Sequence, residues 1–144
     1  MVWTKVNYRP TRDLDLLGFG DSSAITIQRL FQEICTLAVD ADGLIFDAQS
    51  VQVHPIREEQ EYQGQRVELI AKLGQARIHL QIDIGLGDSV SPVPVERGYP
   101  TLLEFPQPYL RMYAKESVIA EKLHAMVALD LTNSRMKDFY DLWT

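Results

Sequence analysis

Two aspartates that stand two residues apart are the first feature of this sequence that could do chemistry. Asp13 and Asp15 lie in an otherwise apolar run with Leu14 and Leu16. If this run is a β-strand, alternate side chains share a face, so both carboxylates point one way and both leucines point into a core. Two carboxylates on one face repel each other unless a cation lies between them, and Mg²⁺ prefers such oxygen ligands. The pattern also fits a strand end with two solvated acids.

A third carboxylate ends a second predicted strand. Over residues 78–84 isoleucine and leucine alternate with His79, Gln81 and Asp83, so Asp83 belongs to the polar side of the strand. If this strand lies beside the strand at 13–17, three carboxylates converge, as a two-metal site for phosphoryl transfer requires. The alternative is that Asp83 only edges the sheet.

Four more charged residues could contact a phosphate or complete such a site. Lys122 lies beside the apolar stripe of a helix predicted over 117–131, where it either extends its charge to solvent or binds phosphate. Asp138 and Asp141 are three residues apart in a second predicted helix, so they share a face. Arg12, directly before the aspartate pair, is either a solvated charge or a partner for phosphate.

The elements that must position these residues are predicted from periodicity. Apolar residues recur at helical spacing over 22–39, whereas the pattern switches to period two from residue 44 onward. The hairpin is predicted from a turn at Gly74-Gln75 between two alternating runs. The predicted elements are a strand at 13–17, a helix at 22–39, strands at 44–46 and 51–56, a hairpin at 67–84, a proline-rich connecting segment at 89–113, and the two helices above.

Length, charge and cysteine content narrow the class of protein. The 144 residues suggest a single domain, and a net charge of −6 argues against broad binding of a nucleic-acid backbone. No apolar run approaches the ~20 residues that a membrane-spanning helix needs. The single cysteine, Cys35, cannot form an internal disulfide and fits a reducing cytoplasm.

Four short blocks stand in a recognisable order along nearly the whole chain. They are TRDLD (11–15), DIGLGD (83–88), AEKL (120–123) and KDFYDL (137–142). Their combination resembles the AbiEii/AbiGii family, nucleotidyltransferase-like toxins of bacterial toxin–antitoxin and abortive-infection systems. The resemblance implies an α+β fold of the DNA-polymerase-β-like nucleotidyltransferase superfamily, in which a mixed β-sheet is flanked by helices.

The resemblance also implies roles for the residues above. Lys122 would contact the triphosphate, and Asp138 or Asp141 would be the acidic residue of the last motif. The implied reaction is Mg²⁺-dependent transfer of a nucleotide from an NTP to an acceptor, with tRNA as a candidate acceptor and a separately encoded antitoxin as partner. The implied ligands for two Mg²⁺ ions are Asp13, Asp15 and Asp83.

One motif of the family is not found in this sequence. Members carry a Gly-Gly or Gly-Ser motif upstream of D-x-D, whose backbone amides cradle phosphates, but residues 1–10 contain no glycine. We therefore expect residues 1–144 to form one nucleotidyltransferase-like domain truncated at both ends, with exposed apolar surface that favours a homodimer. The alternative is a degenerate remnant that binds nucleotide or protein. A further alternative is a metal-dependent nuclease, in which we would expect a lysine soon after an acid on the central strand. Asp83 is instead followed by Ile-Gly-Leu-Gly, which disfavours this alternative.

Overall fold

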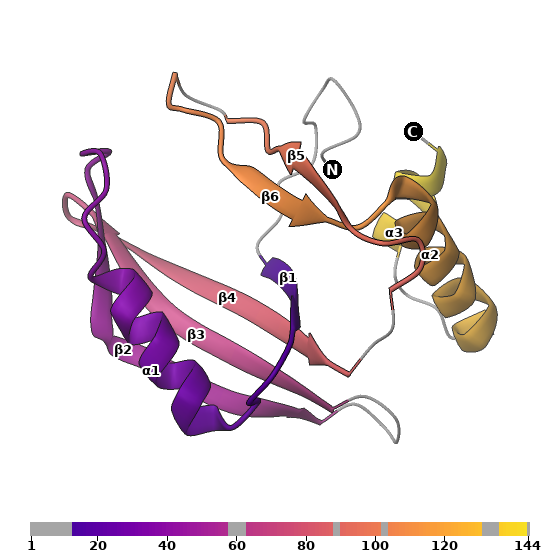
Figure 1. The fold of residues 1–144 in the computed structure, drawn as a ribbon, viewed down its shortest axis with the longest axis horizontal. Coiled ribbons are helices and arrows are strands. Elements are labelled where there is room, and N and C mark those ends of the chain that lie inside the picture. Colours follow the sequence, from indigo (N-terminus) through magenta and orange to yellow (C-terminus); the bar gives the residue numbers. More distant parts are fainter. Residues whose placement is uncertain (1–12, 58–62, 88–89, 102–103, 131–135, 144) are drawn as a thin grey trace. The chain divides into compact units, whose positions relative to one another are not determined.

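The chain divides into two compact units, which are described separately. The computed structural model describes residues 13–57, 63–87, 90–101, 104–130 and 136–143. The first unit spans Thr11–Asp88, and the second contains the described residues from 90 onward. Figure 1 shows the elements of each unit along the chain. Among the described residues, no helix is long and apolar enough to cross a membrane.

A four-stranded mixed sheet forms the body of the first unit. Its strands are β1 (Asp13–Gly18), β2 (Leu44–Arg57), β3 (Gln63–Leu73) and β4 (Ala76–Leu86), in the order β1-β4-β3-β2. β1 runs parallel to β4, whereas β3 is antiparallel to both of its neighbours. The structure confirms the predicted hairpin, which is formed by β3 and β4. It also confirms that the first strand lies beside β4, and that the fold is α+β with a mixed sheet.

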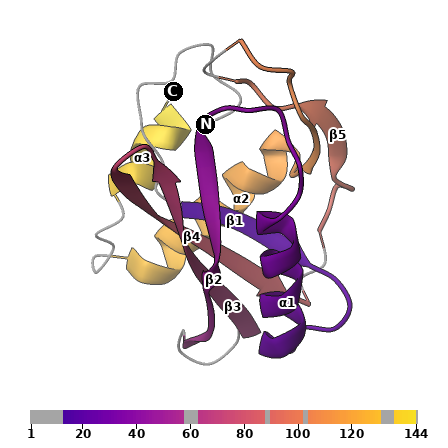
Figure 2. The same ribbon diagram turned by 90° about the vertical axis from the view of Figure 1, so that its left-hand side faces the viewer.

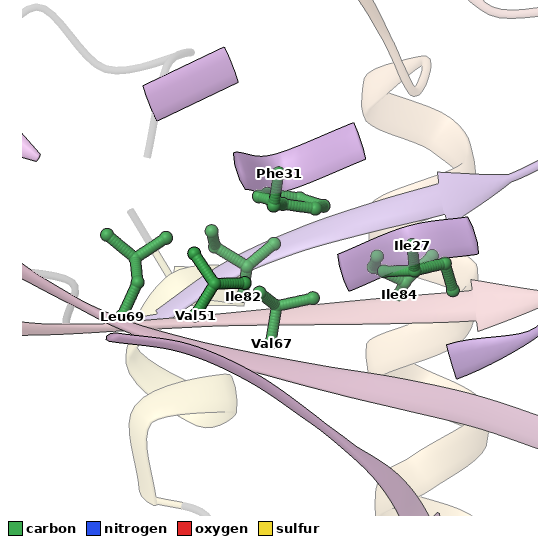
Figure 3. Close-up of a cluster of buried hydrophobic side chains, with 7 residues drawn as sticks. All are labelled: Ile27, Phe31, Val51, Val67, Leu69, Ile82 and Ile84. Atoms are coloured by element: carbon green, nitrogen blue, oxygen red, sulfur yellow. The ribbon is translucent and has the colours of Figure 1, made fainter. Parts of the chain in front are cut away.

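Helix α1 (Ala24–Cys35) covers one face of this sheet (Figure 2). The helix begins where the Ser23 hydroxyl accepts a hydrogen bond from the Thr26 amide at 3.3 Å. It ends earlier than the periodicity predicts, because the Thr36 amide and hydroxyl both donate to the Glu33 carbonyl. Ile27 and Phe31 of α1 pack on buried residues of β2, β3 and β4 (Figure 3). The buried cluster consists of Ile27, Phe31, Val51, Val67, Leu69, Ile82 and Ile84.

The prediction that Leu14 and Leu16 point into a core is wrong. Their side chains remain 50% and 41% exposed. The register pairs Leu14 with Ile82 and Leu16 with Ile84, so both leucines do lie on the α1 side of the sheet. They are exposed because α1 lies over β2, β3 and β4, which supply the buried cluster, whereas β1 lies at the opposite edge of the sheet from β2 and contributes no residue to that cluster.

The two strands predicted at 44–46 and 51–56 form one strand, β2. The pairing with β3 shifts register between Asp47 and Gln52. At this irregularity the Ser50 hydroxyl donates to the Asp47 carbonyl at 2.6 Å and accepts from the Ile70 amide at 2.9 Å. The side chain therefore satisfies a backbone amide where the ladder is interrupted, so the strand continues through the bulge.

The described residues of the second unit form two short strands and two helices. β5 (Val95–Gly98) pairs antiparallel with β6 (Tyr109–Met112), and α2 (Lys115–Leu129) and α3 (Met136–Trp143) follow. The segment at 89–113, predicted as a connecting segment, contains these two strands. Neither VERG of β5 nor YLRM of β6 alternates apolar and polar residues, so the two strands have no clear signature in the sequence.

Candidate functional site

The predicted acids of the first unit lie on the two paired strands β1 and β4. Asp15 stands directly opposite Asp83, and Asp13 stands opposite Gln81. Residues opposite each other on paired strands share a face of the sheet. Because Ile82 and Ile84 are buried against α1, Asp15 and Asp83 belong to the face that α1 does not cover. The structure therefore brings two of the predicted carboxylates together on the face that α1 does not cover.

Asp83 is held by an arginine from the other neighbouring strand. Arg66 of β3 is its direct cross-strand partner. The Arg66 Nε donates to Asp83 Oδ1 and Nη2 donates to Oδ2, both at 2.8 Å. Gln81 Nε2 lies 3.3 Å from Oδ2 of the same carboxylate. The hydrogen bonds from Arg66, helped by its charge and by Gln81, keep the pKa of Asp83 below its usual value although partial burial opposes this shift.

Arg66 is a residue of this site that the sequence pattern did not single out. A signal was nevertheless present, because the two-residue turn at 74–75 fixes the register of the hairpin. Arg66 lies seven residues before Leu73, and Asp83 lies seven residues after Ala76. Counting back from the predicted turn therefore places the only guanidinium of this stretch of β3 opposite Asp83.

A second cluster of predicted residues forms in the second unit, between α2 and α3. Lys122 Nζ lies 2.6 Å from Asp138 Oδ1 and 3.0 Å from Asp141 Oδ2. The side chains of Asp138 and Asp141 are only 3% and 5% exposed. Burial opposes the charge of Lys122, but the hydrogen bonds to both carboxylates outweigh it and raise the pKa of the ammonium.

This triad confirms that Asp138 and Asp141 share a face of their helix. It also brings Lys122 to them, which spacing alone did not predict. The two ion pairs of Lys122 connect α2 to α3. The contact of Lys122 with a triphosphate stays a prediction.

Two of the predicted side chains are not described by the structure. Arg12 lies outside the described residues, and so does the side chain of Asp13. Within the described part of the chain, no group of three or more acidic, histidine or cysteine side chains could hold a metal ion.

The carboxylates of the first unit differ in how well they suit a magnesium ion. Carboxylate oxygens are the ligands that Mg²⁺ prefers, and it commonly keeps several waters, so one or two carboxylates suffice. Asp13 and Asp15, at alternate positions of β1, fit this requirement. Asp83 fits it less well, because both of its oxygens already accept hydrogen bonds from Arg66.

Comparison with known proteins places the chain in a family. The family model described as "Nucleotidyl transferase AbiEii toxin, Type IV TA system" matches residues 1–144. Neither the curated proteins nor the solved structures gave a match. The family match covers the D-x-D strand, β4 with Asp83, and the helices that carry Lys122, Asp138 and Asp141. The chain therefore belongs to the AbiEii nucleotidyltransferase toxin family.

Proposed function

We propose that this chain transfers a nucleotide from an NTP to an acceptor hydroxyl with the help of Mg²⁺. The observation that carries the proposal is the parallel pairing of β1 with β4, which sets Asp15 opposite Asp83 on the face away from α1. The family match supports the same class of reaction. Carboxylates gathered on one face of a sheet are a feature that a metal-dependent phosphoryl-transfer site uses.

In this proposal Asp13 and Asp15 hold the metal ion, since they stand at alternate positions of one strand. When bound, Mg²⁺ neutralises phosphate oxygens and lowers the pKa of an attacking hydroxyl. The sheet supplies the rigidity of the site, because β1 is fixed to β4 along six paired residues. Rigid placement of carboxylates matters because a metal site tolerates only small errors in ligand position.

The acceptor and the partners belong to the same proposal. We take tRNA as the first acceptor to test and the cytoplasm as the location, because NTPs and tRNA are available there. The family description names a type IV toxin–antitoxin system, so an antitoxin is the expected counterpart. The exposed leucines of edge strand β1 support self-association into a homodimer.

A transfer assay tests this function. The protein is incubated with Mg²⁺, each α-³²P-labelled NTP in turn, and total tRNA, and labelled RNA is measured on a gel. Asp15→Asn should lower product formation by at least about 100-fold, because loss of a metal ligand costs more than the 10–100-fold typical of outer-shell partners. Asp47→Asn is the matched control, since Asp47 pairs with Lys72 in the same sheet. Equal activity of Asp15→Asn and wild type would contradict the proposal.

A second candidate function is a non-catalytic module that binds nucleotide or protein. The observation that favours it is the engagement of both Asp83 oxygens by Arg66, which leaves the acid cluster with one ligand fewer. This candidate predicts NTP binding without labelled product for any acceptor.

A further inference from the structure

Asp15, Asp83 and Arg66 form a row across three adjacent strands. Asp83 is paired in register with Asp15 on one side and with Arg66 on the other. Neighbouring strands lie about 4.8 Å apart, so the Cα atoms of Asp15 and Arg66 are about 10 Å apart. The guanidinium of Arg66 binds the carboxylate of Asp83, the residue that stands between Arg66 and Asp15 in the row. The row thus carries a cation on the same face as the proposed metal ligand.

The Arg66–Asp83 pair has the geometry of a fixed guanidinium. Two parallel N–H···O bonds of 2.8 Å hold the planar group in one orientation, which a single contact would not do. The Arg66 side chain is 39% exposed and that of Asp83 is 21% exposed, so part of the arginine is accessible to a ligand. The Asp83 side chain is the more buried of the two, as expected if Asp83 holds the guanidinium of Arg66 in place.

The same geometry makes Asp83 a poor metal ligand. A cation that bound this carboxylate would compete with a guanidinium for both oxygens and would lie beside a full positive charge. Arginine, in contrast, matches the oxygens of phosphate as well as it matches those of a carboxylate. The nucleotide of the proposed reaction brings phosphate oxygens to this face.

We propose that Arg66 binds the phosphates of the nucleotide and that Asp83 is the positioning residue that holds its guanidinium beside Asp15. This inference rests on the proposed function and names the residue that receives the phosphates. It departs from the expectation that Asp83 completes the metal site as a third ligand.

The test separates metal binding from phosphate binding. Mn²⁺ binding without nucleotide is followed by electron paramagnetic resonance, and binding of inorganic tripolyphosphate is followed by calorimetry with and without Mg²⁺. The variants are Arg66→Gln, Arg66→Lys, Asp83→Asn, Asp15→Asn and the double variant of Arg66→Gln with Asp83→Asn. Lys72→Gln is the matched control, because Lys72 lies on β3, is also paired with an aspartate, and is six residues or about 20 Å further along the strand.

Arg66→Gln should weaken tripolyphosphate binding roughly tenfold or more, as expected for loss of a charged hydrogen-bonding partner. Arg66→Lys should recover part of the loss because it keeps the charge but not the planar fork. Lys72→Gln should bind as wild type. In the Asp83→Asn background, Arg66→Gln should cost only about threefold or less, because an arginine without its anchor contributes less. Mn²⁺ affinity should fall in Asp15→Asn and stay within about twofold of wild type in Asp83→Asn.

Three results would overturn the inference. Loss of Mn²⁺ binding in Asp83→Asn equal to that in Asp15→Asn would make Asp83 a metal ligand, while the proposed function would stand. An equal cost of Arg66→Gln in both backgrounds would remove the positioning role of Asp83. A wild-type protein that binds neither Mn²⁺ nor tripolyphosphate would contradict the proposed function itself.

Discussion

Replacing Lys122 by methionine tests whether the triad between α2 and α3 stabilises the second unit. Methionine keeps most of the length of the side chain but removes the ammonium that lies 2.6 Å from Asp138 and 3.0 Å from Asp141. Two carboxylates that are 3% and 5% exposed then lose their ion pairs with this ammonium. Removing one partner from a buried ion pair costs about 3–5 kcal/mol. Because Lys122 is itself 20% exposed, we expect a loss near the lower end, about 3 kcal/mol.

Urea unfolding followed by circular dichroism measures this loss. Lys115→Met is the matched control, since Lys115 is an exposed lysine at the start of the same helix. Its free energy of unfolding should stay within about 0.5 kcal/mol of wild type, as for most exposed positions. A triple variant, Lys122→Met with both aspartates changed to leucine, should regain much of the loss because no unpaired charge remains buried.

The dependence on pH gives an independent check of the triad. The pKa of Lys122 is raised in the folded protein by its hydrogen bonds to the two carboxylates. The pKa of Lys122 is therefore higher in the folded protein than in the unfolded chain, where it is about 10.4. The stabilisation is fully present below this unfolded-state pKa and is lost as the pH rises through the pKa of the folded protein. Wild type should therefore lose stability above about pH 10.4, and Lys122→Met should lack this alkaline component. Unfolding of Lys122→Met at the same urea concentration as wild type would refute the reasoning.

Two further predictions concern the first unit. Phe31→Ala should lower the free energy of unfolding by about 3–5 kcal/mol, because Phe31 lies in the buried cluster under α1. The control Leu37→Ala, at a position 64% exposed, should lower it by less than about 1 kcal/mol. Equal losses for the two variants in urea unfolding would contradict the assigned core. Cys35 should react more slowly with a thiol reagent at pH 8 in the folded protein than in the urea-unfolded protein. The reason is that burial, together with the charge of Asp47, raises the pKa of its thiol. Equal reaction rates would contradict the placement of Cys35 against the core.

Much of the first unit could be predicted because its signals are local. The period-two runs on either side of Gly74-Gln75 determine the β3–β4 hairpin, and a two-residue turn fixes its register. The apolar alternation of residues 78–84 likewise assigns Asp83 to the polar face. These features depend on neighbours in the sequence, so the sequence pattern contains them.

The errors arise where the outcome depends on distant parts of the chain. Leu14 and Leu16 show the pattern of a core-facing strand, but their exposure depends on which strands α1 covers. The continuity of β2 depends on Ser50, whose hydroxyl accepts a hydrogen bond from the Ile70 amide of β3 and donates one to the Asp47 carbonyl of β2. Arg66 was missed for a different reason, since its register was available but a single arginine on a strand has no motif of its own.

Calorimetric titration of the protein with each NTP, with and without Mg²⁺, tests the central claim most directly. The account predicts that at least one NTP binds in a Mg²⁺-dependent manner and that Asp15→Asn removes this dependence, while Asp47→Asn preserves it. Binding of no NTP under either condition would contradict the claim that the acid pair of β1 and β4 is a nucleotide site. Binding that Asp15→Asn leaves unchanged would place the nucleotide elsewhere on the chain.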